Sequence, residues 1–113
     1  MEKPDNRAFI YEISQAIIQV ELYLAQANIE EFMQDRKLKD AVIYRLTVIG
    51  EASAQITKDY ISEHPNIPWK DIVGMRHKLI HDYSEVDLDV VWKVAKEDLP
   101  TLKNKIQKLL TQP

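Results

Sequence analysis

Apolar residues recur at steps of three and four positions along most of this chain, and no other feature constrains its fold as strongly. One series runs through residues 8–27, a second through about 37–60, and further series start at Trp69 and Val91. Residues at this spacing share one face of an α-helix, which can be buried against other helices. No alternating pattern of strand length interrupts them. The sequence therefore predicts an all-α fold.

Capping residues and prolines mark the expected helix ends. Asn28 is a candidate N-cap for a short helix that leads into the long one over 37–60. Pro65 and Pro68 predict a break, because proline lacks the amide donor. Pro68 also suits the first turn of a third helix, which starts near Trp69.

The last segment carries two candidate caps and one internal proline. Ser84 resembles the start of a capping box, and Asp87 is a second candidate cap for the same helix. Pro100 should bend or split this helix near Leu99, with Asp98 as a possible cap for the second half. We expect an up-and-down bundle of four to five helices.

Length and composition bound the remaining possibilities. The chain has 113 residues, enough for one core, so we expect a single domain over 1–113. The absence of cysteine removes thiolate metal sites and suits a reducing compartment. With no signal peptide and no membrane-spanning apolar run, we expect a cytoplasmic protein without a membrane partner. A net charge of −3 argues against coating nucleic acid, although a small basic site remains possible.

Both glycines lie within helical patterns. Gly50 and Gly74 each cost roughly 1 kcal/mol relative to alanine in a helix. Close approach of two helix backbones, inside the bundle or across a dimer interface, would explain them. The alternative is that the glycines are tolerated and have no role.

The stretch RHKLIHDY concentrates ionisable side chains at the end of the third predicted helix. At 100° per residue, Arg76 and Tyr83 would lie about 20° apart, and His77 and His81 would share another face. Arg76 and His81 differ by about 140°. They can converge on one ligand only if the helix loosens near Ile80 or if a second subunit supplies the missing partner.

Arg76 and His81 together suit the cleavage of a phosphodiester. Arginine directs two donors toward phosphate oxygens, and histidine can give or take a proton near neutral pH. In RNA, a neutral imidazole could take the proton of the 2′-hydroxyl while the guanidinium stabilises charge on the phosphate. This chemistry requires no metal.

Metal binding and simple helix capping are the alternatives. His77 and His81 have the i, i+4 spacing of zinc ligands, but no glutamate follows His77, and a third ligand would have to come from Asp82, Glu85 or His64. We therefore predict no metal site and no cofactor. Lys78 and the two histidines could instead favour the negative end of the helix. Arg76 could form an ordinary ion pair with Glu51 or Asp82.

The motifs resemble those of the HepT-like toxins of the HEPN superfamily. The resemblance covers nearly the whole chain, and its specific motifs lie in residues 49–102. They are Ile49-Gly50-Glu51-Ala52, Ile67-Pro68-Trp69, Gly74-Met75, Arg76-x4-His81-Asp82-Tyr83, Val86-Asp87, Val91-Trp92 and Leu99-Pro100. Position 77 is more often asparagine in that motif, so His77 departs from it.

The resemblance implies a dimeric helical bundle in which the arginine and histidine of both subunits line one cleft. It implies a metal-independent endoribonuclease, the toxin of a toxin–antitoxin pair, with Arg76 and His81 as catalytic residues. The implied antitoxin is a minimal nucleotidyltransferase that transfers AMP to Tyr83, where the added charge would block the substrate phosphate. His77, Lys78, Asp82 and Glu51 are candidate auxiliary residues. The alternative is a non-catalytic helical subunit that binds a nucleotide or substrate for a partner nucleotidyltransferase.

Overall fold

The computed structural model describes residues 5–112, and within them every side chain except that of Tyr83. This part of the chain is helical and contains no strand, as the apolar spacing predicts. The four long helices are α1 (Asn6–Leu24), α3 (Arg36–Ala54), α5 (Trp69–His81) and α7 (Leu99–Thr111). The three short helices are α2 (Ile29–Gln34), α4 (Lys58–Glu63) and α6 (Leu88–Lys93).

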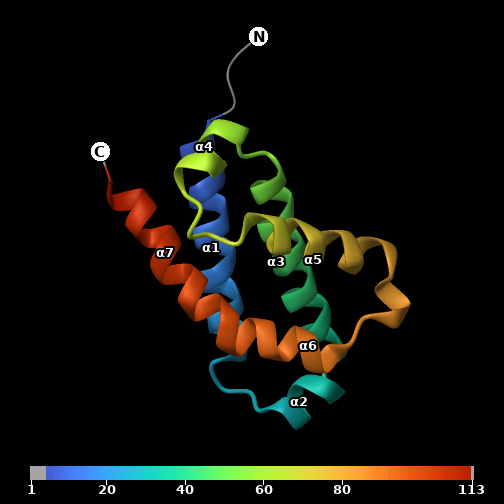
Figure 1. Cartoon of the computed structure of the whole chain (residues 1–113). Coiled ribbons are helices and arrows are strands. Elements are labelled where there is room, and N and C mark those ends of the chain that lie inside the picture. Colours follow the sequence, from blue (N-terminus) through green and yellow to red (C-terminus); the bar gives the residue numbers. More distant parts are fainter. Residues whose placement is uncertain (1–4, 113) are drawn as a thin grey trace.

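Helices α1 and α3 form the centre of the molecule. They run antiparallel and pack along their length, as in an up-and-down bundle, whereas α5 runs across α3 (Figure 1). Helices α6 and α7 together form a rod that starts at the lower end of α3 and continues diagonally along α1, on which α7 packs (Figure 1). The motif helix α5 is therefore held mainly by α3.

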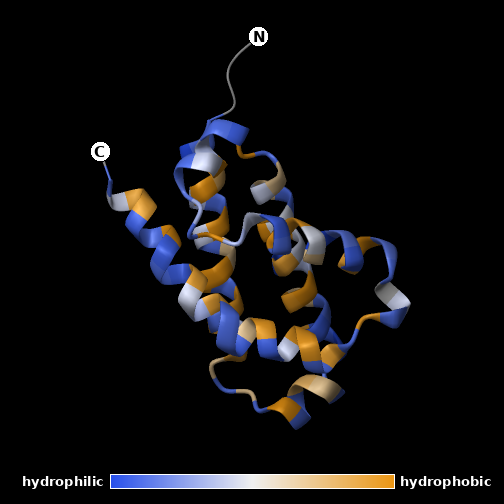
Figure 2. Cartoon of the chain, in the orientation of Figure 1, coloured by the Kyte–Doolittle hydropathy of each residue, from blue (hydrophilic) through white to orange (hydrophobic). Residues whose placement is uncertain are grey.

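The predicted apolar stripes form one connected core. Orange segments face one another across the helices in Figure 2, and the blue ones face outward. The most deeply buried apolar side chains, each no more than 1% exposed, are Ile10, Ile13, Ala16, Ile17, Val20, Phe32, Val42, Leu46, Ile49 and Ile106. They come from α1, α2, α3 and α7, so the core joins segments distant in sequence. Burial of this apolar surface is the main force that holds the helices together.

The long second helix is shorter than the sequence predicts. It ends at Ala54, and α4 starts at Lys58 with Thr57 as its N-cap, so the prediction of one helix to about Tyr60 was wrong. Asn6 fixes the break from the start of α1. Its side-chain amide donates to Thr57 Oγ1 at 3.0 Å, and its side-chain oxygen accepts from Thr57 N at 3.1 Å. A contact between distant residues therefore sets this helix end.

Two of the predicted caps are confirmed. Asn28 forms a capping box with Glu31: each side chain accepts a hydrogen bond from the other residue's backbone N–H, at 2.8 and 3.3 Å. Asp87 caps α6 by accepting from Asp89 N at 2.9 Å. The first candidate, Ser84, lies instead in a 3-10 turn, η1 (Tyr83–Glu85). The second of the two candidate caps is therefore the correct one.

The last helix is divided before Pro100, as predicted, by a π-helical turn, η2 (Val94–Asp98). The amide of Leu99 bonds to the carbonyl of Val94, five residues earlier. Pro100 lies in the first turn of α7, where its missing amide costs little. Asp98 occupies the N-cap position with helical backbone angles and makes no side-chain cap bond, so the prediction that it caps α7 was wrong.

Candidate functional site

Gly50 of α3 sets the position of α5 next to it. A Cβ atom added to Gly50 would lie 3.0 Å from Cγ and 3.3 Å from Cα of Arg76, and closer still to Cβ of Arg76. Only glycine permits this approach, so the expected close contact of two helices is confirmed at Gly50. A Cβ added to Gly74 would meet no atom within 4 Å. Gly74 therefore has no packing role within the protomer.

The side chain of Arg76 projects from α5 toward Glu51, which follows Gly50 in α3. Its Nη2 lies 3.5 Å from Oε1 of Glu51, and the two side chains are 33% and 57% exposed. An ion pair this long and this exposed contributes little to stability. The Nε atom of Arg76 is buried and has no hydrogen-bond partner among the described residues. Buried donors normally find an acceptor, so the guanidinium is incompletely satisfied within this part of the protomer.

Arg76 and Glu51 border an open groove of about 650 Å³ on the α1–α3 side. Two exposed tyrosines line it, Tyr11 at 56% and Tyr44 at 60% exposure. Arg45 lies with its guanidinium carbon 5.3 Å from the ring centre of Tyr44. Sequence reasoning missed these three residues. The sequence offered one sign of an exposed site here: both tyrosines lie outside the apolar stripes of their helices.

His77 and His81 lie together on the exposed side of α5. Their ring centres are 4.3 Å apart and the ring planes are inclined by 43°. Helix α5 remains α-helical as far as His81 and does not loosen near Ile80. Arg76 is therefore directed at α3 while His81 pairs with His77. Within one protomer the two predicted catalytic residues do not converge.

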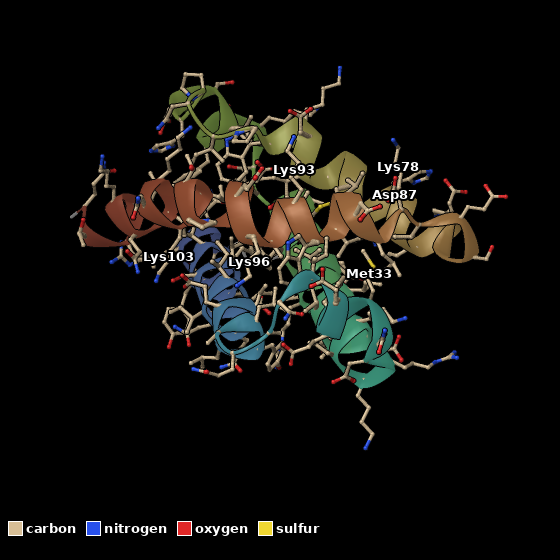
Figure 3. All side chains as sticks on the ribbon, turned by 90° about the horizontal axis from the view of Figure 1, so that it is seen from below. Met33, Lys78, Asp87, Lys93, Lys96 and Lys103 are labelled. Carbon is tan, nitrogen blue, oxygen red and sulfur yellow. The ribbon has the colours of Figure 1, made fainter. Side chains whose placement is uncertain are left out.

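The other predicted residues are dispersed around this helix end. Lys78 lines a different groove, of about 670 Å³, between α5 and the α6–α7 rod. Figure 3 shows Lys78 and Met33 on opposite sides of that rod. Asp82 is exposed and ends α5, its N–H bonding to the carbonyl of Lys78. Among the auxiliary candidates, Glu51 forms an ion pair with Arg76 in the described part of the chain.

Tyr83 does not continue α5. It starts the 3-10 turn η1, so the predicted helical alignment of Arg76 with Tyr83 was wrong. Its side chain lies outside the described residues, and its predicted modification remains a prediction.

Two features are absent from the described part of the chain. Residues 5–112 contain no group of three or more His, Asp or Glu side chains placed to hold a metal ion. Among the same residues, no helix combines the length and the apolar character needed to cross a membrane.

Comparison with known proteins gives consistent matches. The family model described as "Ribonuclease HepT-like" matches residues 13–109. "Probable ribonuclease HepT" of Thermococcus cleftensis is 43% identical over 107 residues, covering 95% of this chain and 97% of the relative. Two proteins of Methanocaldococcus jannaschii, "Putative RNase MJ0125" and "Putative RNase MJ1380", are 40% and 38% identical over at least 95% of each chain. No solved structure matches this chain.

Proposed function

This chain belongs to the HepT-like ribonuclease family, and on that premise we propose that it is an endoribonuclease that cleaves RNA without a metal ion. Arg76 and His81 are the proposed catalytic residues. The observation that carries the proposal is the state of Arg76. Its partly exposed guanidinium borders an open groove, and the one ion pair that it forms among the described residues is long and exposed, so its outer N–H groups can bind a phosphate.

Each residue has a defined chemical role. Neutral His81 takes the proton of the 2′-hydroxyl, which then attacks the adjacent phosphorus. Arg76 binds the phosphate and stabilises the charge that gathers on its oxygens. A protonated imidazole returns a proton to the leaving 5′-oxygen. One histidine cannot easily serve as base and acid at once, so two are needed.

A two-fold dimer supplies the second histidine. On the regular helix α5, Arg76 and His81 point about 140° apart, and they are engaged on different sides of it. In the proposed dimer, the arginine of one protomer faces the histidine of its partner across a shared cleft. Isologous association brings both arginines and both histidines into this one cleft.

The same proposal includes regulation. We take the chain to be the toxin of a cytoplasmic toxin–antitoxin pair, silenced when a minimal nucleotidyltransferase transfers AMP to Tyr83. The support is the resemblance of the Arg76-to-Tyr83 motif. AMP two residues after His81 would place a phosphate where the substrate phosphate must bind. Mass spectrometry after incubation with the partner and ATP should find AMP on Tyr83, and no AMP on a Tyr83→Phe variant.

The catalytic assignment is tested with end-labelled RNA in the presence of EDTA. Arg76→Ala and His81→Ala should each lower the cleavage rate by at least ~100-fold, the usual effect of losing a group that stabilises transition-state charge or a positioned acid–base group, respectively. His64→Gln is the matched control. His64 is engaged elsewhere, with its Nδ1 2.9 Å from the carbonyl of Tyr60. Circular dichroism checks that the variants fold. Undiminished cleavage by both catalytic variants would refute the assignment.

A mixing experiment tests the shared cleft. When wild-type protomers are mixed with a threefold excess of His81→Ala, about one quarter of the wild-type protomers should remain in homodimers and the rest should lie in mixed dimers with one histidine. Cleavage per wild-type protomer should therefore fall to about one quarter if the cleft needs a histidine from each chain. An unchanged rate per wild-type protomer would contradict the two-histidine cleft. No cleavage by the wild type would favour the non-catalytic subunit instead.

A further inference from the structure

The paired imidazoles of His77 and His81 are the least explained feature of the motif helix. Both side chains are exposed, they are one helical turn apart, and their rings already lie side by side. Against the expectation of no metal site from the sequence, we propose from this ring geometry that His77 and His81 bind Zn²⁺ and chemically similar transition-metal ions, and that a bound ion withdraws His81 from catalysis. The binding site stands on its own geometry, and its inhibitory effect rests on the proposed ribonuclease function.

The geometry of the pair fits a shared metal ion. A zinc–nitrogen bond of ~2.0–2.1 Å places an imidazole centre about 3.2 Å from the ion. Two rings on one tetrahedral zinc then have centres roughly 5 Å apart. The observed separation is 4.3 Å. A small rotation of two exposed side chains closes the difference, with no movement of the backbone.

The surroundings favour a cation and keep it exchangeable. The pair lies in the last turns of α5, where free carbonyls and the helix dipole carry partial negative charge. No third protein ligand completes the site among the described residues, so water must fill the other positions. Imidazole suits zinc, copper and nickel better than magnesium. We therefore expect reversible binding that is selective against Mg²⁺.

Bound metal would act directly on the proposed chemistry. The imidazole lone pair that coordinates the ion is the one that would accept the proton of the 2′-hydroxyl. Because one lone pair cannot do both, each occupied site loses its base. The inhibited fraction should therefore follow metal occupancy. Chelation by EDTA restores the free imidazole and the rate.

Binding is measured first, without RNA. The full chain is titrated with zinc chloride by calorimetry, with magnesium chloride as a second probe, while imidazole ¹⁵N–¹H correlation spectra identify the histidines that shift. We expect one Zn²⁺ per protomer, with shifts of His77 and His81, and no binding of Mg²⁺. His77→Asn should weaken zinc binding at least tenfold, because one imidazole alone cannot chelate. His64→Gln should bind as the wild type does, because His64 is stacked on Tyr60 with ring centres 4.2 Å apart.

RNA cleavage is then measured against zinc concentration, with each variant normalised to its own metal-free rate. Zinc should inhibit the wild type and His64→Gln at the concentration where it binds, and EDTA should reverse the effect. The inhibitory concentration for His77→Asn should rise by the factor found in calorimetry. Equal zinc binding by wild type and His77→Asn would overturn the site. Full wild-type activity at saturating zinc would overturn the inhibition. If the wild type cleaves no RNA, the proposed function fails while calorimetry still decides the metal site.

Discussion

The substitution Gly50→Ala should destabilise the fold, although alanine is the better helix former. The added Cβ would lie 3.0 and 3.3 Å from Cγ and Cα of Arg76, and ordinary carbon contacts are about 3.5–4.0 Å. Since one of these atoms is backbone in mid-helix, Arg76 cannot rotate away, and α5 must move off α3. Overpacking of this kind costs roughly 1–3 kcal/mol, with a close backbone contact at the upper end. The gain in helix propensity returns about 1 kcal/mol, which leaves a net loss of about 2 kcal/mol.

Gly74→Ala is the matched control for this prediction. The same change is made in a helix interior, but the new Cβ meets no atom within 4 Å. Only the propensity term remains, so the free energy of unfolding should rise by about 1 kcal/mol.

Urea unfolding followed by circular dichroism measures both free energies of unfolding, at one protein concentration because dimer stability depends on it. The two substitutions should shift stability in opposite directions. A Gly50→Ala variant as stable as the wild type would refute the claim that this glycine sets the spacing of α3 and α5.

Three further predictions concern a cap, the core and alkaline stability. Asn28→Ala should lower the free energy of unfolding by about 1 kcal/mol in urea, because α2 loses its capping box. Phe32→Ala should cost about 3–5 kcal/mol in the same assay, since the ring is fully buried and its centre lies 5.4 Å from that of Trp92. Burial raises the pKa of Tyr60 above its ordinary 10.0, so its contribution to stability is complete below that pH. It is lost as the pH rises through the folded-state pKa, because the unfolded tyrosine ionises first. Tyr60→Phe should show a smaller loss of stability in unfolding measured from pH 9 to 11, and an unchanged loss would contradict the pKa direction.

Local sequence patterns predicted most of the helices. The helix end that they missed, at the end of α3, involves a contact between residues distant in sequence. The caps at Asn28 and Asp87 are short-range signals, and the structure confirms both. The end of α3 depends on hydrogen bonds between Asn6 and Thr57, which are 51 residues apart. No window of sequence around Thr57 contains the contact with Asn6, although Thr57 as the N-cap of α4 is a local signal that sequence reasoning missed.

The same distinction applies to the candidate site. The angle between Arg76 and His81 follows from helix periodicity, and it indicated that a regular helix could not bring them together within one protomer. Whether Arg76 pairs with Glu51 or Asp82 depends on how α5 lies on α3, and only the packing at Gly50 decides it. The end of α5 at His81 also moved Tyr83 out of the predicted alignment. Sequence reasoning therefore predicted the angle between two residues of one helix, but not the geometry that depends on how the helices pack or where α5 ends.

The π-helical turn makes one stretch of the last helix tolerant of a change in chain length. Val91, Ala95 and Leu99 are all buried, although two steps of four residues drift by about 80° in a regular α-helix. The π-helical turn contains more residues per turn than an α-helix, so it keeps these three side chains on one face, as it would after the insertion of one residue. Deleting one residue between 94 and 98 would leave Val91 and Leu99 seven positions apart, within about 20° of one face of a continuous α-helix. The same deletion inside α7 would rotate every later side chain by about 100° and expose Ile106 to water.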